Sequence, residues 1–158
     1  MIEEALRRIE VTKQEKLHYL DLSGLELDSI PAEVLDVPWI GALSLSNNNI
    51  KDISILVQMT QLHKLAVTNN CVEDISALSR MPKLRFIFLA GNKIKDITQI
   101  KGQSRLKKLV LADNKITFLP DLSEFELLAY LDISGNPLEV PAFATIRPQV
   151  PLLKIYKH

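Results

Sequence analysis

Apolar residues recur along most of this chain at a period longer than that of a helix or a strand. Six consecutive units fit the pattern LxxLxLxxNxL, with isoleucine or valine replacing some of the leucines. The units begin at residues 17, 40, 62, 84, 106 and 128, so successive starts differ by 23, 22, 22, 22 and 22 residues. A fixed period of this length predicts an array of stacked structural repeats.

Each unit contains a short LxL stretch that alternates at a period of two. This alternation predicts a strand whose leucines point inward, and stacking the units aligns the strands into one parallel sheet. Five of the eight asparagines share one repeat position, where Leu25 stands in the first unit. A buried amide there can bind backbone groups of neighbouring turns. The predicted asparagine ladder is Asn48, Asn70, Asn92, Asn114 and Asn136.

An aspartate follows this turn in three units, within the segments KDISIL, EDISAL and KDITQI. These residues, Asp52, Asp74 and Asp96, come just before an apolar pair. Aspartate is a preferred capping residue, so we expect each of them to cap a short helical turn on the outer face of the array.

If the leucines point inward, the residues between them point outward onto the concave face of the sheet. The first predicted column is Tyr19, Ala42, Lys64, Phe86, Lys108 and Tyr130. The second column is Asp21, Ser44, Ala66, Phe88, Val110 and Asp132. The third column is Ser23, Ser46, Thr68, Ala90, Ala112 and Ser134.

Repeats four to six concentrate apolar side chains on this predicted face. A contiguous apolar patch on a sheet surface commonly marks an interaction site. The alternative is that the aromatic side chains pack on one another across strands, which stabilises a sheet by about 0.2 to 1 kcal/mol per pair. With lysine and aspartate at the border, the predicted partner-binding set is Phe86, Phe88, Val110, Tyr130, Lys64, Lys108 and Asp132.

These units resemble the leucine-rich repeat family, specifically its 22-residue class, which occurs in the regulatory subunit of protein phosphatase 1 and in bacterial internalins. The resemblance covers residues 17–138. It implies an α/β solenoid of six to seven repeats, curved so that the concave parallel sheet binds another protein. It implies no catalytic chemistry.

The N-terminal segment, residues 1–16, is expected to cap the first repeat. Ile2, Leu6 and Ile9 are spaced as one apolar stripe of a helix, with charged residues between them. The stretch LHYLDLSGLELDSIPAEVL after it resembles the start of the repeat region in bacterial Roco proteins, where a GTPase follows. No phosphate-binding GxxxxGK loop occurs in this sequence.

Residues 139–158 are expected to form either a terminal cap or a degenerate seventh repeat. Val150, Leu153 and Ile155 reproduce the spacing of a seventh strand, and His158 stands where its asparagine would be. The segment PQVPLLKIY resembles the closing segment of spliceosomal and dynein-associated repeat proteins. A bare last strand would instead favour self-association with another chain.

Charge and composition narrow the classes of function. The 19 basic and 19 acidic side chains cancel. Residues 1–79 carry 6 basic and 12 acidic side chains, whereas residues 80–158 carry 13 and 7, so the halves sum to −6 and +6. The basic half includes Arg85 and Lys107 at one repeat position, which could serve an acidic partner or RNA, although a nucleic-acid role is disfavoured. No apolar run approaches the roughly 20 residues that a membrane-spanning helix needs.

The sequence offers no catalytic constellation, so we expect no enzyme and no cofactor or metal. His18 and His63 fall two repeats apart, and the lone Cys71 is expected to be a small buried residue. Asp21 and Asp132 stand five strands apart, about 24 Å at the usual strand spacing, too far for joint acid and base catalysis.

The sequence therefore predicts a cytoplasmic, non-catalytic module that binds a protein partner through its concave face. The alternatives are a structural repeat segment of a larger regulatory protein of the Roco GTPase or kinase-like type, and a ribonucleoprotein-associated protein that uses its basic edge.

Overall fold

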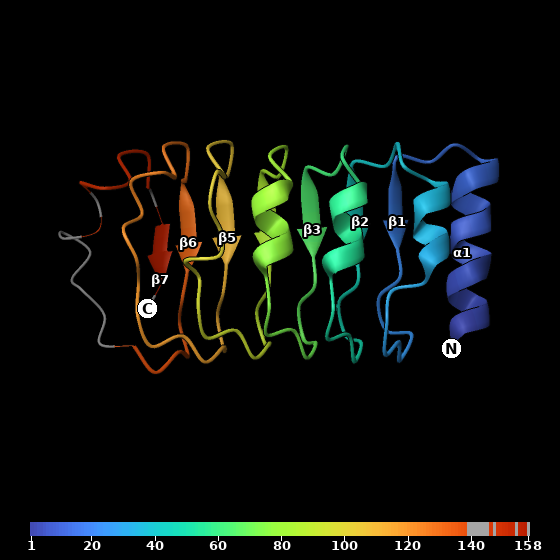
Figure 1. Ribbon diagram of the computed structural model, residues 1–158, viewed down its shortest axis with the longest axis horizontal. Helices are drawn as coiled ribbons and strands as arrows, with labels where there is room; N and C mark the ends of the chain where they lie inside the picture. The colour runs from blue at the N-terminus through green and yellow to red at the C-terminus, as the bar shows by residue number, and fades with distance from the viewer. Residues whose placement is uncertain (139–145, 147, 154, 158) are drawn as a thin grey trace.

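The computed structural model describes residues 1–138, 146, 148–153 and 155–157. An N-terminal helix is followed by short strands that alternate, in the first half of the chain, with single 3-10 turns (Figure 1). In chain order the elements are α1 (Ile2–Gln14), β1 (Tyr19–Asp21), η1 (Ala32–Asp36), β2 (Ala42–Ser44), η2 (Ser54–Gln58), β3 (Lys64–Ala66), η3 (Ser76–Arg80), β4 (Phe86–Phe88), β5 (Lys108–Val110), β6 (Tyr130–Asp132) and β7 (Ile155–Lys157).

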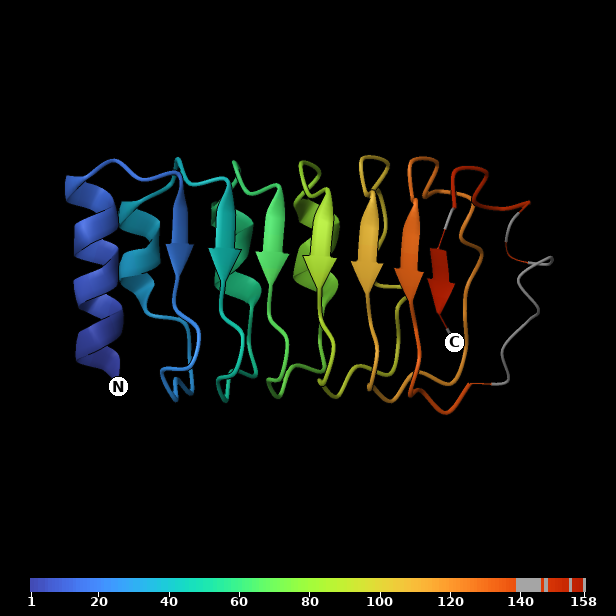
Figure 2. The same ribbon diagram turned by 180° about the vertical axis from the view of Figure 1, so that it is seen from behind.

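The strands form one seven-stranded parallel sheet in sequence order, which confirms the predicted α/β solenoid (Figure 2). Between β2 and β6, paired residues on neighbouring strands are 22 positions apart in the sequence. Leu43 therefore lies opposite Leu65, and Ile87 lies opposite Leu109. The central residue of each strand from β1 to β6 is at most 2% exposed. The inward-pointing leucines and isoleucines therefore fill one continuous core along the array.

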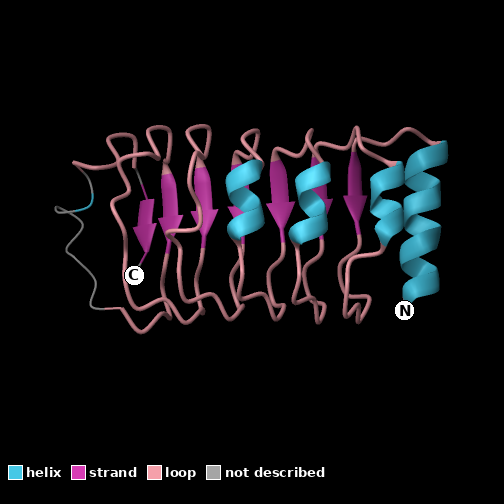
Figure 3. Cartoon of the chain, viewed as in Figure 1, coloured by secondary structure: helices cyan, strands magenta, loops and turns pink. Residues whose placement is uncertain are grey.

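The helical turns lie on the opposite side of the sheet from the face in front in Figure 2, and Figure 3 shows that they accompany only the first repeats. The carboxylates of Asp52 and Asp74 accept hydrogen bonds from the backbone N–H groups of Ser54 and Ser76, at 2.7 and 2.8 Å, where η2 and η3 begin.

The helix expected after Asp96 is absent, and this expectation is wrong. Asp96 still accepts the N–H of Thr98 at 2.8 Å, but only a turn follows. Gly102, at φ +71°, occupies the position where Arg80 closes η3, and a left-handed residue there ends the 3-10 geometry.

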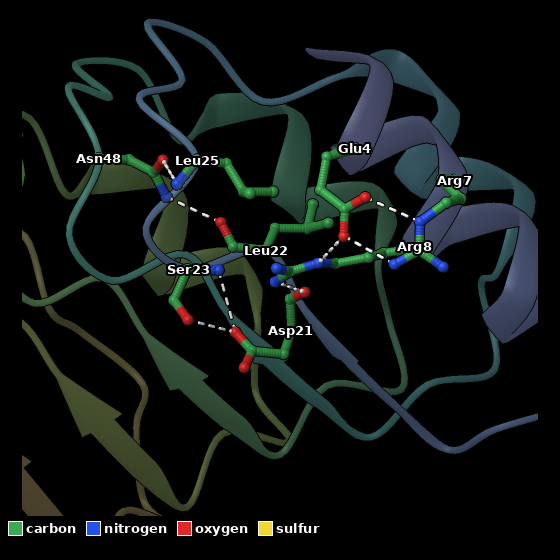
Figure 4. Close-up of polar contacts among 8 residues, drawn as sticks. All are labelled: Glu4, Arg7, Arg8, Asp21, Leu22, Ser23, Leu25 and Asn48. Carbon is green, nitrogen blue, oxygen red and sulfur yellow. Dashed lines mark hydrogen bonds and ion pairs between the residues drawn. The ribbon is translucent and has the colours of Figure 1, made fainter. Parts of the chain in front are cut away.

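The asparagine side chains bind backbone groups of two successive repeats. Asn92 Oδ1 accepts the N–H of Val72 at 3.0 Å, and its Nδ2 donates to the carbonyls of Val67 and Leu89 at 2.8 and 3.0 Å. Asn48 bonds in the same way to the first repeat, where it joins Leu25 and Leu22 (Figure 4). Asn70, Asn114 and Asn136 repeat the pattern.

Helix α1 packs beside β1 and η1 at the N-terminal end of the array (Figure 1). The guanidinium group of Arg8, on this helix, donates a hydrogen bond to the carbonyl of Asp21 at 3.0 Å. The helix thereby satisfies a backbone acceptor of the first strand (Figure 4). The apolar stripe predicted for this helix is wrong. Ile2 and Leu6 are 45% and 36% exposed, whereas the buried face is Ala5, Ile9 and Thr12, whose small residues let the helix lie close to the first repeat.

A seventh strand is present, but three residues later than the sequence predicted. Ile155 pairs with Tyr130, and Tyr156 pairs with Leu131, the position that the repeat spacing assigned to Leu153. Leu153 instead donates its N–H to Val150 O at 3.0 Å, as Leu128 does to Phe125 O, so this last repeat is longer by three residues. His158 lies outside the described residues.

Candidate interaction surface

The outward side of the strands presents the predicted columns of side chains, and we call this surface the sheet face. The strand register places the first two columns side by side, from Tyr19 through Lys64 to Tyr130 and from Asp21 through Ala66 to Asp132. The third column continues through backbone hydrogen bonds such as Asn69 N–H to Ala90 O at 2.8 Å. On the sheet face, residues that are 22 positions apart in the sequence therefore lie side by side.

The N-terminal end of the sheet face is hollowed. An open hollow of about 340 Å³ is lined by Tyr19, Asp21, Ala42, Ser44, Lys64 and Ala66, together with backbone of the core residues between them. Burial alone would raise the pKa of Asp21, but hydrogen bonds from Ser23 and the nearby Arg8 guanidinium outweigh it, and the pKa is lowered. Asp21 is therefore ionised at neutral pH, and Lys64 brings a positive charge to the same hollow.

Toward the C-terminal end, lysine and aromatic side chains come together in what we call the cation–aromatic cluster, formed by Lys64, Phe86, Phe88, Lys108 and Tyr130. The ammonium groups of Lys64 and Lys108 lie 5.8 and 5.3 Å from the centroid of the Phe88 ring. Lys108 also lies 4.2 Å from the ring centroid of Tyr130. Phe86, Phe88, Val110 and Tyr130 are all half-buried, so the surface remains accessible.

This geometry revises the predicted picture of an apolar centre with a charged border. The lysines reach over the rings instead of bordering them, because a lysine stem packs along apolar surface while its ammonium group stays near water. Val110 lies directly beside Phe88 in the strand register and completes the apolar part of the surface.

Asp132 occupies the predicted column, but it is 8% exposed. Its carboxylate accepts the N–H and hydroxyl of Ser134 at 3.1 and 2.6 Å, the arrangement that Asp21 makes with Ser23 in the first repeat. Asp21 is exposed because β1 has no strand before it, whereas β7 pairs with β6 beyond Asp132. Asp132 therefore offers a partner much less surface than the lysines do.

A basic edge runs along the residues that precede the strands. Lys107 donates its N–H to Arg85 O at 2.8 Å, and Arg85 donates to His63 O at the same distance, so these residues are neighbours. The side chains of all three are exposed. Gly41 separates His63 from His18 in this edge.

No group of three potential metal ligands occurs within the described ranges of the chain. Cys71 is half-buried rather than buried, in a hollow that it shares with Lys51, Glu73, Asp74 and Lys93. Across the residues that the structure places, no helix is both long and apolar enough to cross a membrane.

One structural column was not recognised from the sequence. After each strand from β1 to β6, the third residue beyond the strand adopts positive φ. The column is Gly24, Asn47, Asn69, Gly91, Asp113 and Gly135, with φ between 53° and 70°. Glycine, asparagine and aspartate tolerate this conformation best, and their recurrence at a spacing of 22 or 23 residues is the signal that could have revealed it.

Sequence and structure comparisons agree with this fold. A family model described as leucine rich repeats (2 copies) matches residues 42–80. No curated protein matches the chain. An internalin (inlF) from Listeria monocytogenes is 26% identical with a TM-score of 0.76, over 95% of this chain and 43% of that chain. Internalin C2 (inlC2) from the same species is 20% identical with a TM-score of 0.87, over 97% and 72%.

A third similar structure is the leucine-rich repeat ectodomain of the plant membrane receptor kinase GASSHO1/SCHENGEN3 from Arabidopsis thaliana, in complex with CASPARIAN STRIP INTEGRITY FACTOR 2. It is 25% identical with a TM-score of 0.73, over 87% of this chain and 18% of that chain. The chain thus spans less than half the length of two of these three structures. The repeat, the parallel solenoid and these comparisons show a leucine-rich repeat protein. Domains of this fold are typically protein-interaction modules without catalytic groups.

Proposed function

We propose that this chain is a non-catalytic module that binds a protein partner through the sheet face of repeats three to six. The observation that carries the proposal is the set of half-buried apolar side chains on the outward side of adjacent strands, namely Phe86, Phe88, Val110 and Tyr130. Apolar side chains that remain accessible gain little for the fold, whereas a partner that covers them removes apolar surface from water.

The alternative interpretation, in which the aromatic residues only firm up the sheet, has partial support because the lysines and rings do pack together. Packing of this kind is compatible with binding, since an interface gains from side chains that are already ordered. The receptor-kinase ectodomain that resembles this chain is itself described in complex with CASPARIAN STRIP INTEGRITY FACTOR 2, which supports a binding role here.

The test is affinity purification from a lysate of the source cells with the intact chain as bait. We expect proteins retained by the wild type to be lost from a Phe86→Ala/Phe88→Ala double variant. Phe118→Ala is the matched control, because Phe118 is 67% exposed and lies in the loop after β5, away from the strands. Equal capture by all three proteins, with unfolding transitions in the same place, would contradict the proposal.

A second candidate role is a repeat segment within a larger regulatory protein. It is favoured by the short span of this chain relative to the inlF internalin and the plant receptor kinase ectodomain. In that setting the last strand, β7, would pair with further structure or with a second copy. Sedimentation velocity over a hundredfold concentration range tests self-pairing, and an invariant monomer would contradict it.

A cytoplasmic location belongs to the same proposal. Its support is that the one cysteine, Cys71, cannot form an internal disulfide, as is usual in reducing compartments. Fractionation of cells that express the tagged chain tests this, and recovery outside the cytoplasm would contradict it.

A further inference from the structure

The two lysines of the cation–aromatic cluster converge on one ring from opposite sides. Lys64 on β3 and Lys108 on β5 lie opposite Phe86 in the register, yet their ammonium groups lie over Phe88, two residues further along β4. The electron-rich faces of the rings attract the ammonium groups and restrict where they sit. The structure thus holds two positive charges at defined positions on the sheet face.

Among the residues that the structure describes, neither of these ammonium groups forms an ion pair with a carboxylate. The ion pairs among the described residues join Arg7 and Arg8 to Glu4, and Lys13 to Asp36, and none includes Lys64 or Lys108. The basic edge adds more positive charge beside them, because Lys108 donates its N–H to the carbonyl of Arg85 at 3.1 Å. The surface therefore combines accessible apolar rings with two cations that no carboxylate of the described part of the chain pairs with.

We infer that the partner of this surface is an acidic protein segment, a statement that rests on the proposed function and adds the chemistry of the ligand. Its carboxylates would bind Lys64 and Lys108, and an apolar side chain between them would pack on Phe86 and Val110. Charge complementarity of this kind steers association and fixes the register of the partner.

Single-stranded nucleic acid is the other class of ligand that binds aromatic residues and lysines on a sheet. Bases stack on exposed ring faces, but in this cluster ammonium groups already lie over the rings of Phe88 and Tyr130. The arrangement favours carboxylates presented by a protein.

The experiment is a selection of random 12-residue peptides, displayed on phage, against the intact immobilised chain. We expect the enriched peptides to be net acidic, with an apolar residue between carboxylates. Lys64→Gln/Lys108→Gln should weaken their binding about tenfold or more, and raising the salt from 50 to 500 mM should weaken it to a similar degree. Lys64→Arg/Lys108→Arg should keep the affinity within about twofold, because arginine keeps the charge and stacks on rings.

The matched charge control is Lys51→Gln/Lys93→Gln. It removes the same charge from exposed lysines beside Cys71, away from the cluster, and should leave peptide binding unchanged. A fluorescent oligo-dT of 12 nucleotides serves as the nucleic-acid probe, and sedimentation velocity reports binding of a second copy of the chain.

The outcomes separate this inference from the proposed function. Neutral or basic peptides that lose binding in the Phe86→Ala/Phe88→Ala variant would overturn the acidic partner and leave the sheet face as the binding site. Peptides that bind the lysine variant and the phenylalanine variant as well as the wild type would overturn both the acidic partner and the sheet face as the binding site. Failure to enrich any sequence, oligo-dT binding that competes with the peptides, or a salt-sensitive dimer abolished by Lys64→Gln/Lys108→Gln would each overturn the acidic segment as the occupant.

Discussion

The ammonium group of Lys108 lies 4.2 Å from the centroid of the Tyr130 ring on the next strand. The two residues are 22 positions apart in the sequence and directly opposite in the sheet. The repeat brings the two residues together, and the same lysine also lies over Phe88 on the preceding strand. The predictions below separate what the repeat contributes to stability from what the sheet face contributes to binding.

Removing an amide of the asparagine ladder should destabilise the chain strongly. Asn92→Ala leaves the N–H of Val72 and the carbonyls of Val67 and Leu89 without their buried partner. We expect the free energy of unfolding in urea to fall by about 2 to 4 kcal/mol. Asn49→Ala is the control, because Asn49 is exposed and its bond to Leu27 O is made by the backbone. Equal losses in the two variants would contradict a buried hydrogen-bonding role for Asn92.

Glycines in the positive-φ column should differ in how well they accept a side chain. Gly24→Ala adds a methyl group in open space, so its cost is the backbone strain alone, about 1 to 2 kcal/mol. Gly91→Ala adds the same strain and places Cβ against Oδ1 of Asn69. Thermal unfolding should show the larger loss for Gly91→Ala, and Asn69→Gly in the same chain should recover part of it. No recovery would mean that backbone strain explains the whole effect.

Acid should weaken the turns that the aspartates cap. Hydrogen bonds from the backbone N–H and side chain of Ser54 lower the pKa of Asp52, and those of Ser76 lower the pKa of Asp74. A carboxyl whose pKa is lower in the folded state stabilises the fold above its unfolded pKa, about 3.9, and loses that contribution as pH falls through the folded value.

The measurement is urea unfolding between pH 6 and pH 2.5. The wild type should lose stability below about pH 4, and Asp52→Asn/Asp74→Asn should lose less over the same range because it has fewer such carboxyls to protonate. Parallel curves for the two proteins would show that the caps do not contribute to the acid sensitivity.

Adjacent residues on β4 should respond in opposite ways to truncation. Ile87 is fully buried, so Ile87→Ala should cost about 2 to 5 kcal/mol of stability. Phe88 is half-buried on the sheet face, and Phe88→Ala should cost about 1 kcal/mol, mainly from the lost contacts of its ring with the two lysine ammonium groups. Urea unfolding of the two variants checks this. A loss for Phe88→Ala as large as that for Ile87→Ala would favour self-packing over binding as the role of the aromatic residue.

The fold was predictable because one spacing determines so much of it. Once residue 65 is assigned inward, the period of 22 places residues 43, 87, 109 and 131 inward as well, and each is buried. The same arithmetic failed at the last strand, where three extra residues shift Tyr156 into the place expected for Leu153. It also failed at α1, because helical spacing alone does not reveal that Ala5 and Thr12, rather than Ile2 and Leu6, face the first repeat.

The candidate site was predictable only in its columns. Alternation along the strands placed Lys64 and Lys108 opposite Phe86, which the register bears out. It did not reveal that both ammonium groups extend diagonally to Phe88, because a lysine has several rotatable bonds and its direction depends on the attraction of the ring. Nor could the periodicity distinguish Asp21 from Asp132. Asp21 is exposed on the first strand of the sheet, whereas Asp132 lies on a strand that has a neighbouring strand on both sides.

Because each strand pairs only with the strands before and after it, the array can grow without redesign. Duplication of residues 40–61 would insert one further turn, with its own asparagine and capping aspartate, between β2 and β3. The new strand would separate Asp21 from Lys64 in the hollow that they both line, while the lysines and rings from β3 to β6 would keep their present order. The number of repeats in this molecule can therefore change while the residues that would contact a ligand stay the same.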